Sequence, residues 1–444
     1  MTAIISNNFR LNAAKELVDD AVNSSSYYLF VGRSEPWASE TSPDVPYDNT
    51  FSYHTDTWQR MTAMKEITDL DITFGVPRYQ WISGTTYSEY DDRDAALATR
   101  PYYVISDNNN VYLCLKSGGI STQNPDTTGV QTNGIIDFSG SDGYVWKYLF
   151  TVSTDDSIKF LTSAFIPVRY ITAQPAVGAD TALSNQWDVQ QNAVDGAVYN
   201  IKVSNGGSGY TSAPTVTVTG DGTGLTATAV ISGGVVTGVN VTAAGTGYNQ
   251  VAVTLSGGGG SGATAYGVIG PKSGFGADPR EDLRAHYVTL NVSLVYADGQ
   301  GDFIVGNDFR QIGIIRNPYN FGTTTVATAE TLSATKALVV ALGGSFANDS
   351  EIEGTVSGAK AIVDSYDSVN GIIRFHQTEA TGYVDFDTGD FIRVVGDAGA
   401  GQDCTAINNP EVQPYSGEVI FLENRTPVNR ASDQIETIKL VLEF

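Results

Sequence analysis

The stretch Ser141–Ser153, SDGYVWKYLFTVS, constrains the fold of this chain more than any other part of the sequence. It opens with the turn pair Asp142-Gly143 and continues with aromatic and β-branched residues, which favour a pleated strand. Lys147 is the only charge after the turn, so neighbouring elements must supply apolar surface on both sides. The sequence therefore predicts a buried strand in the interior of a sheet rather than at an edge.

The rest of the composition also favours β structure. A chain of 444 residues is too long for one ordinary core, so we expect two to four compact units. The 47 glycines, in a chain otherwise rich in Val and Thr, favour many short strands joined by tight turns. The predicted fold class is mainly β with minor α: a multi-domain core of β-sandwich or barrel-like units with two inserted small β domains.

The charge balance disfavours several kinds of partner. With 25 basic against 49 acidic residues, the formal net charge of -24 repels nucleic acid and anionic membrane surfaces. Cys114 and Cys404 are far apart, so neither a disulfide framework nor a thiolate metal site is indicated, which fits a reducing cytoplasm. We expect no signal peptide and no membrane-spanning segment, because the N-terminal residues lack a basic start and a long apolar run.

Local patterns predict the order of elements. Asn7 or Asn8 is expected to cap a short helix, because apolar residues from Leu11 to Val22 are spaced by threes and fours. Trp58–Ile67 is interpreted as a helix, and Tyr102–Ile105 and Val111–Leu115 as a hairpin. Further strands are predicted at Tyr27–Gly32, Ile72–Val76, Phe165–Tyr170, His286–Tyr296, Phe309–Ile315, Glu418–Glu423 and Ile435–Phe444.

A duplicated β unit follows residue 195. The segment beginning at Val203 recurs from Val241, and the matching residues Tyr210 and Tyr248 are 38 positions apart. Each copy has a Gly-Ser/Thr-Gly-Tyr turn and an alternating Val/Thr strand, so the pair can bury a face that one copy could not. Thr331–Ile407 is predicted to be a second small barrel-like or sandwich unit.

We find no catalytic constellation and expect neither enzyme activity nor a metal or other cofactor. His54, His286 and His376 lie in separate segments without partner spacing, which argues against a zinc site or a Ser-His-Asp triad. Asp91–Asp94 lacks the spacing of a calcium loop, and Ser256–Ser261 lacks the lysine and helix of a phosphate loop. Glycoside hydrolysis would need a pair of carboxylates in one cleft; the candidates are Glu351, Glu353, Asp385, Asp387 and Asp390.

Four separated motifs give the chain a resemblance to a known family. They are Phe30–Trp37 (FVGRSEPW), Asp142–Phe150 (DGYVWKYLF), Phe309–Pro318 (FRQIGIIRNP) and Ser416–Val428 (SGEVIFLENRTPV), the last continuing through Asp433-Gln434 to Phe444. In this order they resemble the dimeric baseplate wedge subunit of contractile-tailed phages. The resemblance implies a non-enzymatic, mainly β virion protein that is assembled in the host cytoplasm and located in the tail baseplate. The implied partners are a second copy and other baseplate wedge proteins, with no nucleic acid and no membrane.

The motifs also suggest a division of the chain. The resemblance covers residues 1–195, 271–323 and 411–444, which are interpreted as the N-terminal core, its continuation and the C-terminal core strands. Residues 196–270, the Gly-rich duplicated unit, and 324–410, the small β domain, fall between matched motifs and are interpreted as insertions into surface loops.

Two sets of candidate binding residues remain open. The motif loops supply interface candidates, each of which could instead make contacts within the chain: Arg33, Glu35, Trp37, Arg316, Asn317, Glu423, Asn424 and Arg425. The alternative function is a tail-associated adhesin that binds host-surface glycan, for which Tyr210 and Tyr248 would have to form an exposed platform. Both tyrosines could also pack over their own turns.

Overall fold

The computed structural model describes residues 4–46, 51–127, 129–130, 132–294, 307–429 and 435–444, and only the backbone of residues 51–53. The fold is mainly β, with 41% of residues in strands and 12% in helices, which confirms the predicted fold class. The chain forms two compact units. Unit 1 contains Met1–Glu16, Thr73–Thr289 and Val441–Phe444, and unit 2 contains Leu17–Ile72 and Leu290–Leu440.

One sheet of unit 1 contains the strand predicted from the Ser141–Ser153 stretch. Its order is β4-β5-β7-β6, so β7 lies in the interior, as predicted. Trp146 and Lys147 are both fully buried on β7. The Lys147 ammonium donates to the carbonyl of Asn133 at 2.6 Å. Burial lowers the pKa of Lys147 to about 8, although the negative charge of Asp282 opposes this shift. The strands are β4 (Tyr103–Ile105), β5 (Asn110–Lys116), β6 (Ile135–Asp137) and β7 (Val145–Thr151).

A second four-stranded sheet has the order β25-β15-β3-β8. Its strands are β3 (Ile72–Pro77), β8 (Phe165–Val168), β15 (Tyr287–Leu294) and β25 (Glu436–Glu443). The predicted strand at His286–Tyr296 is thus confirmed as far as Leu294, whereas its last two residues lie outside the described part of the chain. The motif residues Asp433 and Gln434 also lie outside it.

The described helices are few and short. They are α1 (Asn7–Asn23), α2 (Phe51–Gln59), α3 (Thr154–Lys159), α4 (Thr181–Gln191) and α5 (Pro279–Asp282), with 3-10 turns η1 (Leu97–Thr99) and η2 (Pro125–Thr127). The sequence predicted α1, but Ser6 caps it, because the Ser6 hydroxyl accepts from the Phe9 amide at 3.2 Å. The sequence interpretation missed α4, whose buried face includes Gln186 and Gln190 and so lacks a clear apolar stripe.

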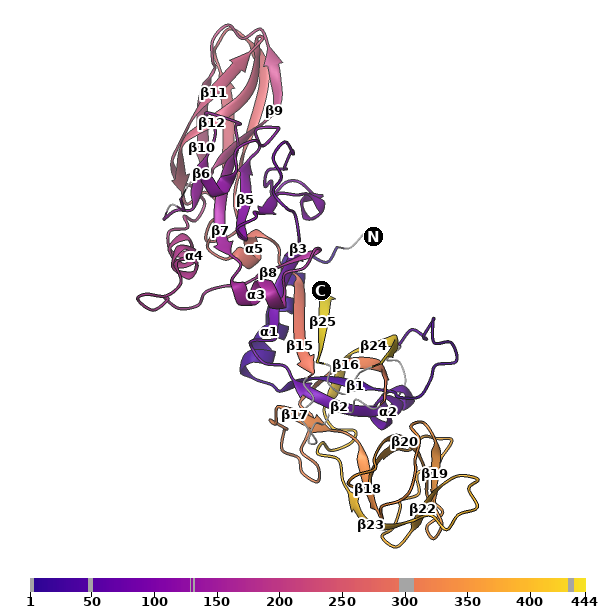
Figure 1. Cartoon of the computed structure of the whole chain (residues 1–444). Coiled ribbons are helices and arrows are strands. Elements are labelled where there is room, and N and C mark those ends of the chain that lie inside the picture. Colours follow the sequence, from indigo (N-terminus) through magenta and orange to yellow (C-terminus); the bar gives the residue numbers. More distant parts are fainter. Residues whose placement is uncertain (1–3, 47–50, 128, 131, 295–306, 430–434) are drawn as a thin grey trace. The chain divides into compact units, whose positions relative to one another are not determined.

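The duplicated segment forms a six-stranded sheet in unit 1, with the order β10-β13-β14-β9-β12-β11. Figure 1 labels β9, β10, β11 and β12 of this sheet. The strands at the two ends of this order, β10 and β11, also contact each other. With that contact, replacing each strand by its counterpart in the other copy gives the same pairs of neighbouring strands. The copies therefore share one interior, as the repeat predicted. The strands are β9 (Asn200–Ser208), β10 (Thr215–Gly220), β11 (Thr223–Ser232), β12 (Val235–Thr246), β13 (Val251–Ser256) and β14 (Ser261–Val268).

The central sheet of unit 2 corrects one prediction. Its order is β17-β2-β1-β16-β24, and Met61–Glu66 is the strand β2 rather than part of the helix predicted over Trp58–Ile67. The residues of β2 favour a helix, but pairing on both sides by β1 and β17 overrides that local preference. The other strands are β1 (Tyr27–Gly32), β16 (Phe309–Arg316), β17 (Thr331–Ser333) and β24 (Glu418–Val428).

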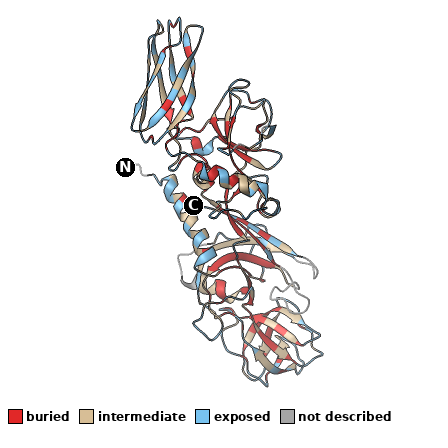
Figure 2. Cartoon of the chain, turned by 90° about the vertical axis from the view of Figure 1, so that its left-hand side faces the viewer, coloured by how far each residue is buried: buried red, intermediate tan, exposed pale blue. Residues whose placement is uncertain are grey.

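A closed barrel completes unit 2. Its strands follow the order β18-β21-β20-β19-β22-β23, which refines the predicted barrel-like or sandwich unit to a barrel. Figure 2 shows buried strand segments in the barrel. Its hydrophobic core includes Leu338, Ile352 and Phe375. The strands are β18 (Lys336–Val340), β19 (Glu351–Gly354), β20 (Lys360–Asp367), β21 (Ile372–His376), β22 (Phe391–Val394) and β23 (Gln402–Asn408).

Candidate assembly surfaces

The loop after β1 carries the first three interface candidates. Arg33 adopts a positive φ of 58°, and its amide donates to the Arg60 carbonyl at 2.8 Å. The guanidinium of Arg33 lies 3.8 Å from the centroid of the Trp37 ring, and the Trp37 indole donates to the carbonyl of Arg425 on β24 at 2.8 Å. The loop is therefore fixed against the edge strand of the central sheet.

Glu35 joins this loop to the barrel through a buried charge cluster. The Glu35 carboxylate accepts from Nε of Arg60 at 2.5 Å and lies 3.5 Å from Nε2 of His376. The other ring nitrogen of His376, at the end of β21, contacts Asp364 on β20 at 2.8 Å. The Ser34 hydroxyl also donates to Asp364, at 2.9 Å. We call Glu35, Arg60, Asp364 and His376 the charge cluster.

Neighbouring groups of opposite charge determine the protonation states of His376 and Glu35 in this cluster. Burial disfavours the imidazolium of His376, but the charges of Asp364 and Glu35 outweigh that effect and raise the pKa of His376 to about 10. Burial likewise opposes ionisation of Glu35, but the contact with His376 and the charge of Arg60 lower the pKa of Glu35 to about 2. At neutral pH, a buried cation is therefore held between two carboxylates that lie on different segments.

A second set of charges, which the sequence interpretation missed, fixes the same loop. Arg310, on β16, is 6% exposed at its side chain and pairs with Glu40 at 2.9 Å and with Asp308 at 2.5 Å. Its guanidinium also donates to the carbonyl of Ser34. Arg310 belongs to the motif Phe309–Pro318, but its neighbours in the sequence did not indicate that its side chain would be buried in a sheet.

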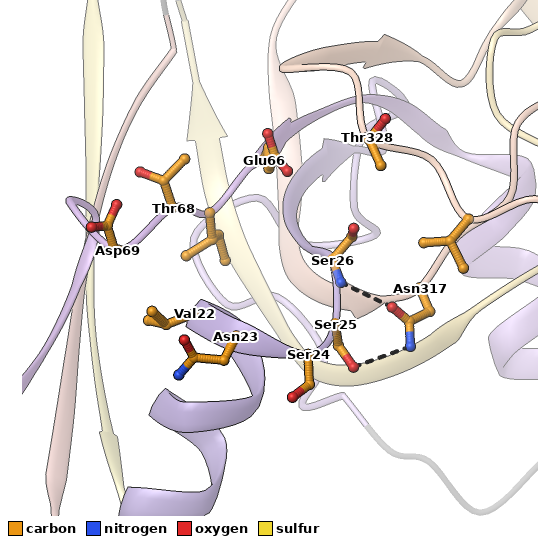
Figure 3. Close-up of a pocket in the computed structure, with 13 residues that line it drawn as sticks. Val22, Asn23, Ser24, Ser25, Ser26, Glu66, Thr68, Asp69, Asn317 and Thr328 are labelled. Atoms are coloured by element: carbon orange, nitrogen blue, oxygen red, sulfur yellow. Dashed lines mark hydrogen bonds between the residues drawn. The ribbon is translucent and has the colours of Figure 1, made fainter.

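Arg316 and Asn317 lie beside an open recess of about 650 Å³ (Figure 3). Nη2 of Arg316 pairs with Asp20 at 2.8 Å. The Asn317 side chain accepts from the Ser26 amide at 2.9 Å and donates to the Ser25 hydroxyl at 3.3 Å. Lining the recess are Ala21–Ser26, Glu66–Asp69, Asn317, Val326 and Thr328, which include carboxylates but no lysine, arginine or histidine. The recess suits a hydrogen-bonding or positively charged group.

The last three interface candidates lie on β24. Glu423 and Arg425 pair with each other at 3.2 Å. The Asn424 amide group donates to the carbonyl of Asp44 at 2.8 Å and accepts from the Gln311 side chain at 2.8 Å. All eight interface candidates are half-buried. Each makes a contact within the chain and also keeps part of its surface exposed, so a role in binding a neighbour stays a prediction.

The duplicated unit does not present the tyrosine platform that the adhesin alternative requires. Tyr210 and Tyr248 are only 5% and 6% exposed. The Tyr210 ring covers Gly260 in the second copy, and the Tyr248 ring covers Gly222 in the first. Each ring thus packs over a glycine turn of the other copy, and no aromatic residue of 196–270 is exposed.

The loop containing Asp91–Asp94 anchors the duplicated unit. Asp91 is 4% exposed, and its carboxylate accepts from Lys202 at 3.0 Å and from the Tyr266 hydroxyl at 2.7 Å. Burial would raise the pKa of Asp91, but these hydrogen bonds lower it below its ordinary value. Lys202 also pairs with Glu89 at 3.2 Å. The loop is therefore held against strands β9 and β14.

The other candidate groups lie in structural contacts. Glu351 pairs with Lys360, Glu353 with Arg393 and Asp385 with Lys336. Asp390 is fully buried and accepts from the amides of Val356, Ser357 and Asp387. In the part of the chain that the structure describes, no three His, Cys, Asp or Glu side chains are grouped as metal ligands would be. Within those same residues, no helix has the length and apolarity needed to span a membrane.

The fold and these sites define a class of protein. The chain is a multi-sheet, mainly β protein whose motif residues fix ordered loops on sheet edges.

The comparisons with known proteins give a distant similarity. No family model matches the chain. The chain is similar to the baseplate wedge protein gp8 of Enterobacteria phage T4, with 24% identity over 206 residues. The similarity covers 38% of this chain and 61% of the phage protein, so the chain spans less than two thirds of that relative. This distant match agrees with the family suggested by the four motifs.

Proposed function

We propose that this chain is a structural subunit of the baseplate wedge of a contractile phage tail. It acts by protein-protein assembly and not by catalysis. It forms a homodimer in the host cytoplasm and joins other wedge proteins in the virion. The observation that carries the proposal is the 206-residue similarity to a baseplate wedge protein. The mainly β fold and the sheet-edge loops fit the role.

The five-part division of the chain belongs to the same proposal. Residues 1–195, 271–323 and 411–444 form the wedge-type core, and 196–270 and 324–410 are insertions. Strands β9–β14 and β18–β23, each forming its own sheet or barrel, support this division. The segment 324–410 also contains β17, which pairs with β2 of the central sheet, so the separate barrel begins at β18.

The proposal predicts a defined change of mass on assembly. Light scattering after size exclusion should give a dimer for the protein alone and a larger stoichiometric complex after mixing with the other wedge proteins of the same phage. A monomer or trimer that does not bind those proteins would contradict the proposal.

The recess beside Asn317 gives a sharper test of where neighbours bind. Asp69 is exposed at its rim, so Asp69→Lys should weaken complex formation by like-charge repulsion if a positively charged group of a neighbour enters the recess. Asp397→Lys, an equal change of charge at an exposed barrel residue, is the matched control. Equal binding by both variants would exclude the recess as a contact.

The structure of the duplicated unit does not support the alternative function as an adhesin. The burial of Tyr210 and Tyr248 leaves neither ring free to stack on a sugar. We therefore do not propose glycan binding by the duplicated unit.

A further inference from the structure

One edge strand of the second four-stranded sheet is long and unprotected. The order β25-β15-β3-β8 places the eight residues of β25 at one end, and no described strand pairs with its other side. The end strands β4, β6, β8 and β17 have only three or four residues. The end strand β24 is longer, but register shifts interrupt it and the Trp37 indole covers part of its edge. A long edge without such protection is a template for pairing with another chain.

The register of β25 shows which of its peptide groups face that edge. The Phe444 amide donates to the carbonyl of His286 at 3.1 Å, and the Thr437 and Ser293 hydroxyls lie 3.2 Å apart. Strand β25 is therefore antiparallel to β15. Peptide groups alternate in direction along a strand, and that of Phe444 faces β15. The amides and carbonyls at the odd-numbered positions of 437–443 therefore face the open edge.

The side chains at these odd-numbered positions share one face of the strand. Lys439, Val441 and Glu443 are all exposed, whereas the residues between them are buried or half-buried. Val441 is 41% exposed. Glu443 lies 3.8 Å from Arg10 and 4.0 Å from His286, and its side chain keeps 57% of its surface exposed. The edge therefore presents a cation, an apolar side chain and an anion at alternate positions.

This pattern is self-complementary about Val441. Two copies of β25 can pair antiparallel across a two-fold axis at Val441, which then lies opposite the same residue of the second copy. Lys439 then lies opposite Glu443 of the partner subunit, and the reverse pair forms on the other side of the axis. All of these positions form hydrogen-bonded pairs, because their peptide groups face the edge. Opposite charges placed directly across two strands also favour the pairing.

Neighbouring symmetric registers lack this match. An axis at Lys439 would place two lysines opposite each other, and an axis at Glu443 would do the same for two glutamates. An axis at Leu440 would place Lys439 opposite Val441 of the partner subunit, so neither charge would meet its opposite. Of the axes between Lys439 and Glu443, only the one at Val441 places opposite charges across the two strands.

Exposed apolar residues near the end of β25 can enlarge such a contact. Ile5 and Phe9 are 59% and 64% exposed. Arg10, next to Phe9 on α1, donates to the carbonyl of Phe444 at 3.0 Å. A stable interface buries about 800 Å² on each partner, which is more than a single strand pair supplies. Apolar side chains beside the strand would therefore contribute to the same interface.

We propose that β25 forms the contact between two copies of this chain. The two strands pair antiparallel with the axis at Val441, and the two four-stranded sheets join into one. This inference rests on the homodimer of the proposed function and names the strand that forms it. The occupant of the edge is a second copy rather than another wedge protein, because the charges of β25 match its own sequence in the reverse direction.

Disulfide cross-linking of the full chain tests the register. Val441→Cys places two thiols across the axis, where Cα atoms about 5.5 Å apart suit a disulfide. Mild oxidation should convert most of the protein to a covalent dimer on a non-reducing gel. Thr437→Cys, exposed on the same face, is the matched control and should stay unlinked, because its two copies are then about 27 Å apart. Cys114 and Cys404 are buried and do not compete.

Charge reversal separates a contact between subunits from a role in folding. Lys439→Glu and Glu443→Lys should each raise the dissociation constant of the dimer at least tenfold, because like charges then face each other across the axis. Light scattering over a dilution series measures this constant. The double variant Lys439→Glu/Glu443→Lys should return it to within about threefold of the original. A loss of local structure would not be reversed by the second change.

Three results would overturn the proposal. They are a dimer that Val441→Cys does not cross-link, a double charge variant that binds no better than the single ones, and a cross-link from Val441→Cys to another wedge protein instead of a second copy. In each case the mass measurements could still give a dimer that joins the wedge complex, so the baseplate role would stand. A monomer at every concentration would contradict the homodimer itself, and this inference with it.

Discussion

The duplicated unit and the barrel are both small β units, but they are stabilised differently. The barrel encloses a core of twelve buried residues, whereas the shared interior of β9–β14 has five, surrounded by half-buried valines and alanines. The duplicated unit relies instead on tyrosine rings packed on glycine turns. The ion pairs that attach the two units also differ in burial. The side chain of Lys202, in the duplicated unit, is 38% exposed, whereas that of His376, in the barrel, is 4% exposed. The duplicated unit is thus stabilised by tyrosine rings packed closely on the backbone of glycine turns, and the barrel by the burial of apolar side chains.

The largest effect is expected from His376→Ala, which breaks the attachment of the barrel. Removing one partner of a buried ion pair leaves uncompensated charge and costs about 3–5 kcal/mol. Urea unfolding should show this loss, and hydrogen exchange should accelerate in barrel peptides but not in those of β9–β14. A loss of protection confined to β9–β14 would contradict the comparison.

Removing a carboxylate from a turn should lower the stability of the barrel more than that of the duplicated unit. Buried Asp390 accepts from three backbone amides and the Ser357 hydroxyl, so Asp390→Ala should cost about 1.5–3 kcal/mol. Asp221 accepts from the amides of Asn249 and Gln250 at the exposed turn of the duplicated unit. Asp221→Ala should lower the thermal midpoint less, and an equal loss would remove this distinction.

A methyl group should destabilise the duplicated unit at one glycine and not at another. A Cβ on Gly222 would lie 2.5 Å from the Tyr248 ring, so Gly222→Ala should cost about 1–3 kcal/mol by overpacking. Gly238 on β12 has no atom within 4 Å of such a Cβ, which makes Gly238→Ala the matched control. Hydrogen exchange of residues 200–268 separates the two variants. Equal protection in both would show that the tyrosine turns are loosely packed.

The barrel attachment should also make stability depend on pH. The pKa of His376 rises from 6.5 to about 10 on folding, so its stabilisation is complete below pH 6.5 and is lost as the pH rises towards 10. The pKa of Glu35 falls from 4.5 to about 2, so its stabilisation is complete above pH 4.5 and is lost as the pH falls towards 2. The urea midpoint should therefore decline between pH 6.5 and 9, with a weaker decline in His376→Gln. The groups facing His376 and Glu35 include Asp364 and Arg60.

Short-range patterns predicted much of this fold. Alternation and aromatic content located β1, β7 and β16, because strand residues that need two apolar faces are recognisable one by one. The repeat with its matching Tyr210 and Tyr248 predicted one shared interior. The four motifs indicated a phage baseplate family, with which the similarity to gp8 agrees.

Long-range contacts decided the rest. Met61–Glu66 became a strand because β1 and β17 pair with it, against its local preference. His376 is held in its charged form by Asp364 and by Glu35, which lies far away in the sequence. The repeat predicted the turns of the duplicated unit, but not that each tyrosine would cover the turn of the other copy. For strands such as β1, β7 and β16, the sequence alone determined where the strand lies, since that depended on neighbouring residues. Only the tertiary structure determined which side chains are buried together, because burial depends on residues that are distant along the chain.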